Sequence, residues 1–296
     1  MLQGKQLTSL GLPLVGGRVD LRGLTAPQPS VVGEFSTPTA DVRRLANLVQ
    51  VRGVRWADID FSGADLQSLR LFDTTLDNCS FDEANCRGWR QWGMSIKNCT
   101  FRGTNLRDAA LGGIDQGKRN SYRRVDFTKA DLRGTAHESA DVVDCIFVET
   151  NLRKVDFQGT VFVNCTFAGE LDEVAFARFA FRGESFPPNE MKGVDFRRAK
   201  LRWAWFRNLD LEDVQWPEDA DHIVVSNYKL ALDRMLDLLR NRTDSSAKGL
   251  TGLLEHCRKW AGPNQYRGVF NRLDLVKSGD EVLVQELLKI CEQPVS

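Results

Sequence analysis

The sequence lacks the signatures of several functional classes. It contains only three histidines, and none lies in a catalytic, metal-binding or phosphate-binding motif. Its seven cysteines form no CxxC pair and no cysteine–histidine metal spacing, so we expect reduced thiols. No apolar run approaches the roughly 18 residues of a membrane helix, and Pro13 and glycines break the short run near the N-terminus. We therefore expect a cytoplasmic protein without cofactor, metal or membrane anchor, and an enzyme is the least favoured class.

The chain also lacks an excess of charge of either sign. Forty Lys and Arg residues balance forty Asp and Glu residues. A nucleic-acid binder carries a net-positive face, and a protein that imitates DNA needs a densely negative one. The balance therefore argues against direct nucleic-acid binding and against an acidic surface over the whole chain. It leaves open a folded protein with acidic residues on one face and arginines on another.

What the sequence does have is a period of five. Every fifth residue within 51–216 is apolar, with the exceptions of Gln91 and His137 and of a few interruptions in register. A period of five fits neither the 3.6 of a helix nor the 2 of a strand. It fits a coil with four sides, in which each side takes five residues and each turn takes about 20. The run Asn-Cys-Ser-Phe at 78–81 indeed recurs as Asn-Cys-Thr-Phe at 98–101.

These quintets resemble those of a known family. Residues 64–68 (Ala-Asp-Leu-Gln-Ser), 130–134 (Ala-Asp-Leu-Arg-Gly) and 194–198 (Val-Asp-Phe-Arg-Arg) are similar to the repeat unit of pentapeptide-repeat proteins. The resemblance covers residues 49–217 and implies a right-handed quadrilateral β-helix. We therefore expect an all-β solenoid of about seven coils over this segment. Family members differ widely in role, so the resemblance implies little about function.

The register also predicts which side chains fill the coil. The large residue at the centre of each quintet and the compact residue two positions before it should point inward. Cysteines at the compact positions are then small buried hydrophobes rather than redox or metal groups. His137, at a centre, is either a core histidine or the mark of a local slip in register. The predicted core includes Phe61, Cys79, Phe81, Cys99, Phe101, Cys145, Phe147, Cys165 and Phe167.

Two irregular places offer candidate partner contacts. Residues 112–124 interrupt the register with glycines and basic residues, which is typical of a projecting binding loop but equally of a tolerated insertion. Trp203 and Trp205 lie at outward positions beside arginines, as at the centre of an interface, although cover by the C-terminal helices is favoured. The candidate partner-binding residues are Lys118, Arg119, Tyr122, Arg123, Arg124, Trp203 and Trp205.

The chain on either side of the repeat is predicted to form caps. Residues 1–48 are expected to be an extension with a cap helix, because apolar residues at helical spacing predict a helix over 38–50. Such a helix would cover the unpaired strand edge at the open end of the coil. Residue 19 begins an isolated quintet, which suggests a partial first coil.

The period becomes helical after Pro217. We expect a helical C-terminal domain or cap over 218–296, with a first helix from about Asp219 to Arg240. A second helix is predicted around Leu250 and a third after a capping box at Ser278.

For function, the neutral surface and rigid coil favour a non-enzymatic scaffold or regulator that binds a protein partner. The resemblance implies an alternative, because some family members protect or inhibit DNA gyrase or topoisomerase IV, imitate DNA and give resistance to gyrase poisons. The partner would then be a type II topoisomerase. Members of the family also form homodimers through coil ends, which is a further expectation here. No catalytic, cofactor-binding or metal-binding residue is predicted.

Overall fold

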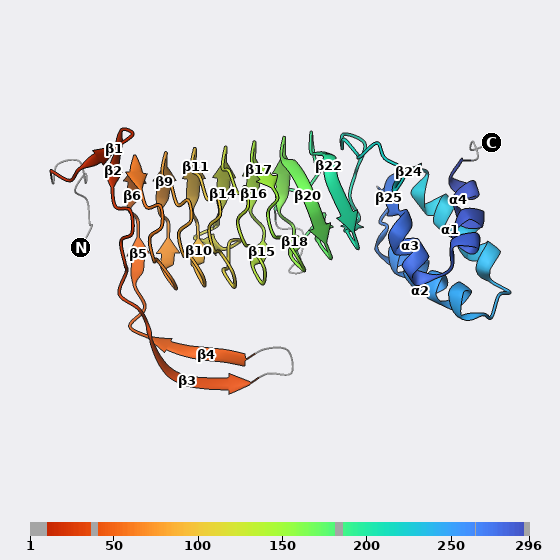
Figure 1. Ribbon diagram of the computed structural model, residues 1–296, viewed down its shortest axis with the longest axis horizontal. Helices are drawn as coiled ribbons and strands as arrows, with labels where there is room; N and C mark the ends of the chain where they lie inside the picture. Colours follow the sequence, from red (N-terminus) through yellow and green to blue (C-terminus); the bar gives the residue numbers. More distant parts are fainter. Residues whose placement is uncertain (1–10, 37–40, 181–185, 264, 293–296) are drawn as a thin grey trace. The chain divides into compact units, whose positions relative to one another are not determined.

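The computed structural model describes residues 11–36, 41–180, 186–263 and 265–292. The chain divides into two compact units, Met1–Asn151 and Leu152–Ser296, which we call unit 1 and unit 2. Both contain five-residue repeats wound into a coil of short parallel strands, whereas the helices within the described residues all belong to unit 2 (Figure 1). The predicted β-helix solenoid is therefore confirmed.

The strands of unit 1 are two to seven residues long. They are β1 (Leu14–Val15), β2 (Arg18–Asp20), β3 (Ser30–Ser36), β4 (Asp41–Ala46), β5 (Gln50–Arg52), β6 (Arg55–Ala57), β7 (Ile59–Asp60), β8 (Arg70–Phe72), β9 (Thr75–Asp77), β10 (Arg90–Trp92), β11 (Ser95–Lys97), β12 (Ile114–Asp115), β13 (Lys118–Arg119), β14 (Ser121–Arg123), β15 (Ala136–Glu138), β16 (Asp141–Val143) and β17 (Ile146–Val148).

Unit 1 has four sides, each built from residues that stack in parallel in successive turns. We number them in chain order from the side that contains Phe61. Side 3 contains the sheet β10–β8–β5, and side 4 contains β16, β14, β11, β9 and β6 in that order. On sides 1 and 2, successive turns are connected mainly by single β-bridges, such as Asp65 to Asn85 and Asn85 to Asn105. Most partners in unit 1 are 20 residues apart, as the repeat predicts.

The backbone conformation at the corners explains which residue types occur two positions after the centre of each quintet. These residues adopt a left-handed backbone, with φ of 53° at Asn78, 52° at Asn98 and 59° at Asp108. Asn, Asp and Gly tolerate this region better than other residues, and they recur at these corners. The chain can therefore turn every five residues without a long loop.

The interior of the coil is a set of stacked side chains. Ring centroids are 5.1 Å apart between Phe61 and Phe81 and 4.7 Å apart between Phe81 and Phe101, with nearly parallel planes. The ladder continues through Phe127 to Phe147. Every side chain named in the predicted core is buried, including Cys79, Cys99, Cys145 and Cys165, and Cys86 is buried as well. Stacked aromatic rings of this kind contribute to close packing of the coil interior.

His137 occupies a centre on side 3 and is buried. Its Nε2 lies 2.9 Å from the Oγ1 of Thr135, and that hydroxyl donates its own proton to the carbonyl of Leu132. The imidazole therefore donates from Nε2 to the hydroxyl oxygen. Burial lowers the pKa of His137 to about 3, which makes it a neutral core histidine.

The helix predicted over 38–50 is wrong for the described residues of that segment. β4 instead pairs antiparallel with β3, from Ser30 opposite Ala46 to Ser36 opposite Asp41, and β5 follows within side 3. A strand partner rich in Val and Phe outweighs the weak helical spacing of Val42 and Leu45. The isolated quintet does join the coil, because β2 pairs in parallel with β7.

The interruption after Leu111 is shorter than predicted. β12 and β13 form a two-stranded hairpin, and β14 already pairs with β11, with Tyr122 opposite Ile96. The register therefore resumes at Ser121, six residues out of step with the 20-residue beat. Gly113 permits the close passage of the chain, because a Cβ there would lie 2.2 Å from the carbonyl oxygen of Gln91.

Unit 2 continues the repeat and then becomes mixed. Its repeat forms the strand runs β18–β21–β23 and β20–β22, and its helical part packs around Leu232, Met235 and Leu254. Its elements are β18 (Asp156–Gln158), β19 (Val161–Val163), β20 (Thr166–Asp172), β21 (Ala175–Ala177), β22 (Asp195–Arg202), β23 (Trp205–Arg207), β24 (His222–Ser226), α1 (Tyr228–Leu239), α2 (Ser245–Trp260), β25 (Arg267–Asn271), α3 (Arg272–Ser278) and α4 (Glu281–Glu292).

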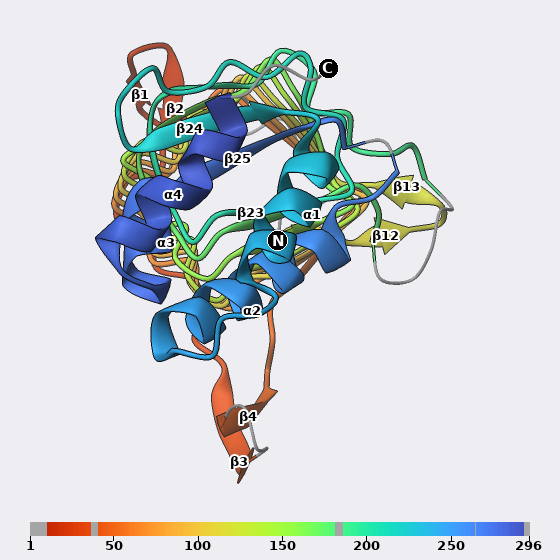
Figure 2. The same ribbon diagram turned by 90° about the vertical axis from the view of Figure 1, so that its right-hand side faces the viewer.

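The prediction for the C-terminal region was right about helices and wrong about where the first one begins. Residues 222–226 form β24, which pairs antiparallel with β25, so α1 starts only at Tyr228 (Figure 2). The run Ile-Val-Val at 223–225 is β-branched and suits a strand. The capping box at Ser278 is also wrong, since Asp280 accepts the N–H of Leu283 at the start of α4.

Three groups from the helical part accept hydrogen bonds from backbone N–H groups at the end of the coil in unit 2. The Nε2 of His222 accepts from Leu201, the carboxylate of Asp274 accepts from Trp203, and the carbonyl of Trp260 accepts from Asn208. In earlier turns the same positions donate to the next turn, as Leu66 does to Asn85. The helical part therefore satisfies a coil edge that would otherwise be open.

Candidate interaction surfaces

The basic loop contributes fewer surface residues than predicted. Arg119 is buried and donates to the carbonyls of Ser139 and Ala140. Tyr122 is also buried, and its hydroxyl contacts the side chain of Gln91 and the carbonyl of Leu111. These two residues cannot touch a partner directly, because Tyr122 fills a centre and Arg119 ties the hairpin to the coil.

The other three loop candidates reach the surface. Lys118 pairs with Asp73 at 2.7 Å, and Arg124 donates from Nε to Asn98. Arg123 is exposed on side 4. Because Lys118 and Arg124 are engaged by their own coil, the loop supplies little unpaired charge.

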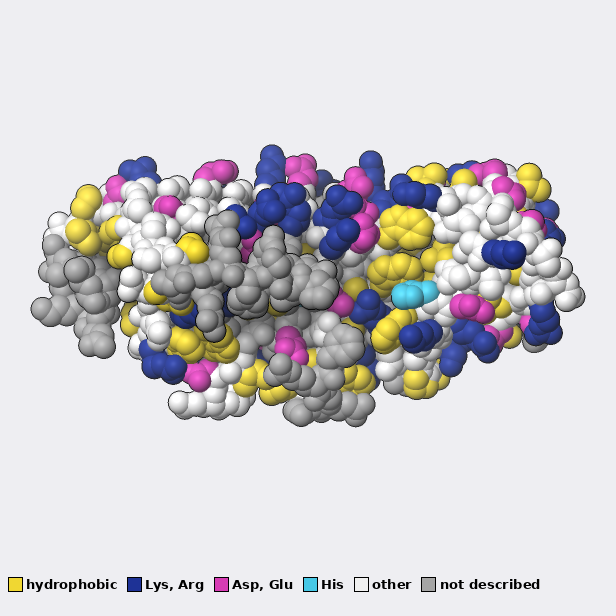
Figure 3. Space-filling model, turned by 90° about the horizontal axis from the view of Figure 1, so that it is seen from below, with side chains coloured by type: hydrophobic (Ala, Val, Ile, Leu, Met, Phe, Trp, Pro, Cys, Tyr) yellow, Lys and Arg dark blue, Asp and Glu magenta, His cyan; other side chains and the backbone are white. Residues whose placement is uncertain are grey.

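Trp203 and Trp205 are partly covered by the helices of unit 2. The ring centroid of Trp205 lies 4.5 Å from that of His256 in α2, and the Nζ of Lys277 in α3 lies 5.7 Å from the Trp203 ring. Both tryptophans line a small cavity of about 50 Å³, together with Trp260. Hydrophobic side chains gather beside a histidine on this surface (Figure 3). The two tryptophans thus pack mainly against the helices of the cap.

A stronger feature is a cluster of arginines where sides 2 and 3 of unit 1 meet. Asn85, Asn105 and Asp131 are bridged in successive turns, so the arginines two residues after them stack in one column. A second column follows across the corner, where Arg70 pairs in register with Arg90. We call this cluster the arginine ladder. It consists of Arg70, Arg87, Arg90, Arg107 and Arg133.

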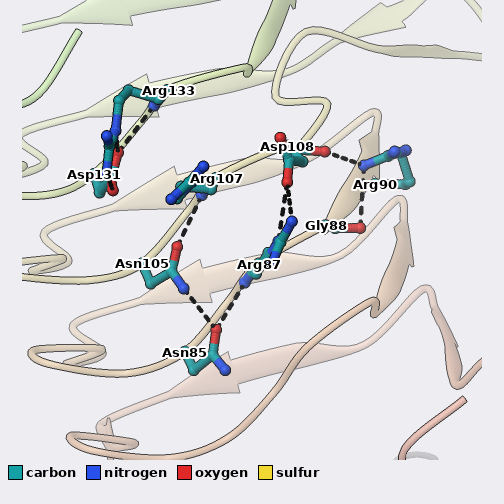
Figure 4. Close-up of polar contacts among 9 residues, drawn as sticks. All are labelled: Asn85, Arg87, Gly88, Arg90, Asn105, Arg107, Asp108, Asp131 and Arg133. Carbon is teal, nitrogen blue, oxygen red and sulfur yellow. Dashed lines mark hydrogen bonds and ion pairs between the residues drawn. The ribbon is translucent and has the colours of Figure 1, made fainter. Parts of the chain in front are cut away.

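Internal hydrogen bonds hold part of the ladder in place (Figure 4). Arg87 pairs with Asp108 at 2.7 Å, and Arg133 pairs with Asp131 at 2.7 Å. Arg90 donates across the corner to the carbonyls of Gly88 and Asp108. The ladder thus presents five guanidinium groups around two carboxylates.

Arg107 is the exception at the middle of the ladder. Its Nε is buried and has no hydrogen-bond partner within the described residues. Its charge still acts on Asp131: burial alone would raise the pKa of that carboxyl, but the hydrogen bonds from Arg133 and the charges of Arg133 and Arg107 lower it. A buried donor without a partner is costly, but the Nε atom is enclosed by the protein, so a ligand could contact only the partly exposed remainder of this side chain.

Two aromatic rings lie on side 3 beside the ladder. Phe72 and Trp92 stack with centroids 4.5 Å apart, and the Arg52 guanidinium lies 4.3 Å from the centre of the Phe72 ring. Each ring is only partly buried. Arg90 and Trp92 flank the inward Gln91 on β10, so both point outward from the same strand. Partly exposed aromatics next to arginine are typical of binding surfaces.

The sequence analysis did not identify the ladder, although its signal is present. Arg87 and Arg107 follow their centres by one residue and are 20 residues apart, whereas Arg133 is 26 residues further on. Only the six-residue hairpin restores the alignment. The described residues contain no cluster of three or more potential metal ligands. They also contain no helix long and apolar enough to span a membrane.

Comparison with solved structures finds matches of low sequence identity. Solved structures with a similar fold include HetL, a pentapeptide repeat protein involved in heterocyst differentiation regulation from the cyanobacterium Nostoc sp. strain PCC 7120. It is 14% identical, with a TM-score of 0.38, covering 68% of this chain and 93% of that one. QnrB1, a plasmid-mediated fluoroquinolone resistance protein, is 17% identical, with a TM-score of 0.31, covering 64% and 91%.

No curated protein sequence matches the chain significantly. The family model for pentapeptide repeats matches residues 138–169, in 8 copies. This match, together with the five-residue register and the stacked turns, shows that the chain contains pentapeptide repeats.

Proposed function

We propose that this protein is a non-enzymatic, cytoplasmic scaffold or regulator that binds an acidic segment of a protein partner on its arginine ladder. The observation that carries the proposal is the excess of cations at one edge of a chain with no net charge. Complementary charge gives specificity and speeds association. Arg107 at the middle of the ladder is only partly exposed, so a carboxylate bound there would form charge-assisted hydrogen bonds in a partly desolvated place.

The proposal is tested by binding of the full chain to poly-L-glutamate and, as a control, to poly-L-lysine. Binding to the acidic polymer should weaken steeply as salt rises from about 50 to about 500 mM, because salt screens exposed charges. The variant in which Arg87, Arg107 and Arg133 are all changed to Ala should lose most of the affinity. A variant with Arg55, Arg123 and Arg124 changed to Ala has the same net charge and should keep it. An equal loss of affinity in both variants would show that binding depends on net charge alone and not on the ladder.

A second candidate function is protection of a type II topoisomerase by imitation of DNA. The observation that favours it is a set of acids on side 1 of unit 1, namely Asp60, Asp82 and Glu83. QnrB1 is named as a fluoroquinolone resistance protein, and the same activity is the second candidate for this chain. A gyrase supercoiling assay with and without a fluoroquinolone tests it. Protection that disappears in the D82N/E83Q variant supports this candidate, and no effect at micromolar protein removes it.

A further inference from the structure

We infer that the partner segment is an acidic amphipathic α-helix that lies along the coil axis, over the corner between sides 2 and 3. This inference rests on the proposed function and specifies the conformation of the bound segment. It follows from the backbone spacing of the arginines, from their positive charge and from the adjacent aromatic pair.

The spacing of the ladder matches a helix. Ring centroids in successive turns are 5.1 Å apart for Phe61 and Phe81, 4.7 Å for Phe81 and Phe101, and 5.5 Å for Phe101 and Phe127. The backbone positions of Arg87, Arg107 and Arg133 rise by the same step, because the residues two positions before them are bridged in successive turns. One turn of an α-helix rises about 5.4 Å, so side chains three or four residues apart recur at nearly this distance. Two intervals along the ladder leave a mismatch of about 1 Å.

An extended segment fits less well. Side chains on one face of a strand repeat about every 6.8 Å, and two such intervals exceed two turns of the coil by about 3–4 Å. A strand could engage Arg87 and Arg107, for example, but would reach Arg133 out of step. A helix with Glu at positions i, i+4 and i+7 can face all three arginines at once.

The chemistry of the corner fits the two faces of such a helix. A carboxylate can approach the partly exposed side chain of Arg107, and planar guanidinium groups bind carboxylates through two parallel hydrogen bonds. Asp108 and Asp131 already neutralise part of the charge of Arg87 and Arg133. The positive excess that attracts an incoming acid therefore comes from Arg70, Arg90 and Arg107. The stacked rings of Phe72 and Trp92 then offer an apolar contact for the neighbouring stripe of the helix.

The test uses the full chain and three synthetic peptides of about 18 residues and equal charge, each with a fluorescent label. The first has Glu at helical spacing beside a Leu stripe, the second has the same residues with two central prolines in place of alanines, and the third has Glu at every second position. We expect the helical peptide to bind at least about tenfold more tightly than the others, and its circular dichroism to gain helical signal on binding. Arg107→Ala should weaken binding about five- to tenfold, and Phe72→Ala about threefold. Arg123→Ala, the matched control, should bind as the wild type does.

The outcomes separate the inference from the proposed function. If the proline or alternating peptide binds as tightly as the helical one, the helix is ruled out while acid recognition stands. If none of the peptides binds, the proposed function fails with it. If a DNA duplex binds at the same salt and is lost in Arg107→Ala, the ladder is a phosphate-backbone site and the inference is overturned. Unfolding midpoints of the variants, measured alongside, show whether each one is folded.

Discussion

The Nε2 atom of His222 accepts a hydrogen bond from the backbone N–H of Leu201, at 3.0 Å, where the carbonyl of a further turn would otherwise lie. The Nδ1 atom of the same ring donates to Asp219 at 2.7 Å, which fixes the tautomer. His222 and Leu201 thus define how the coil of unit 2 ends. A side chain from the strand β24 stands in for the missing backbone.

We expect His222→Ala to destabilise unit 2 by about 1–3 kcal/mol, because it leaves a buried N–H without an acceptor. Glu255→Ala, at an exposed position of α2, is the control and should change stability by less than about 0.5 kcal/mol. Urea unfolding followed by circular dichroism measures both. Equal midpoints for the two variants would show that the imidazole is not part of the cap.

Asp274 provides a second test of the cap. It is buried and accepts from the Nε of Arg202 and the N–H of Trp203. Asp274→Ala should therefore cost about 3 kcal/mol, since it strands a cation and a backbone donor. Hydrogen exchange at Trp203 should accelerate in this variant, and unchanged protection there would argue against the assigned contact.

Phe81 and Arg102 test the register of unit 1. Phe81 is fully buried between Phe61 and Phe101, so Phe81→Ala should cost about 3–5 kcal/mol through the cavity it opens. Arg102 is largely exposed and pairs with Asp126, so Arg102→Ala should cost less than about 1 kcal/mol. Denaturant unfolding of the two variants checks the ratio, and similar losses would refute the inward and outward assignments.

His137 should make stability depend on pH. Its pKa is lowered from 6.5 to about 3 in the folded protein, so the unfolded chain binds the extra proton first. Stability is therefore unaffected above about pH 6.5 and falls below it by about 1.4 kcal/mol per pH unit down to about pH 3. His137→Leu should flatten this contribution in unfolding curves recorded from pH 7 to pH 4. If the mutant and the wild type lose stability in parallel, the imidazole is not the group responsible.

The sequence predicts the coil well because Phe61, Phe81 and Phe101 repeat with a period that no helix or flat strand keeps. It predicts less where two periods compete. The spacing of Val42 and Leu45 suits a helix, but pairing with β3 decides the outcome. Tyr122 was missed as a centre because the hairpin shifts the register by six residues.

The arginine ladder shows a different limit. Arg107 and Arg133 become neighbours only when the insertion is placed outside the coil, and no local pattern reports that Arg107 lacks a partner. The surface depends on alignment between turns, which a linear reading can follow only where the 20-residue beat is unbroken. The C-terminal cap depends likewise on contacts such as Arg202 with Asp274, which are 72 residues apart.

If an acidic partner binds the ladder rather than residues 112–124, its affinity should depend on Arg107 and not on Arg123. The most direct measurement is the affinity of the helical acidic peptide for Arg107→Glu compared with Arg123→Glu, two charge reversals that change the net charge of the chain equally. We predict that Arg107→Glu reduces affinity by at least about twentyfold while Arg123→Glu reduces it by less than about threefold. A larger loss for Arg123→Glu, or equal losses for both variants, would contradict the account.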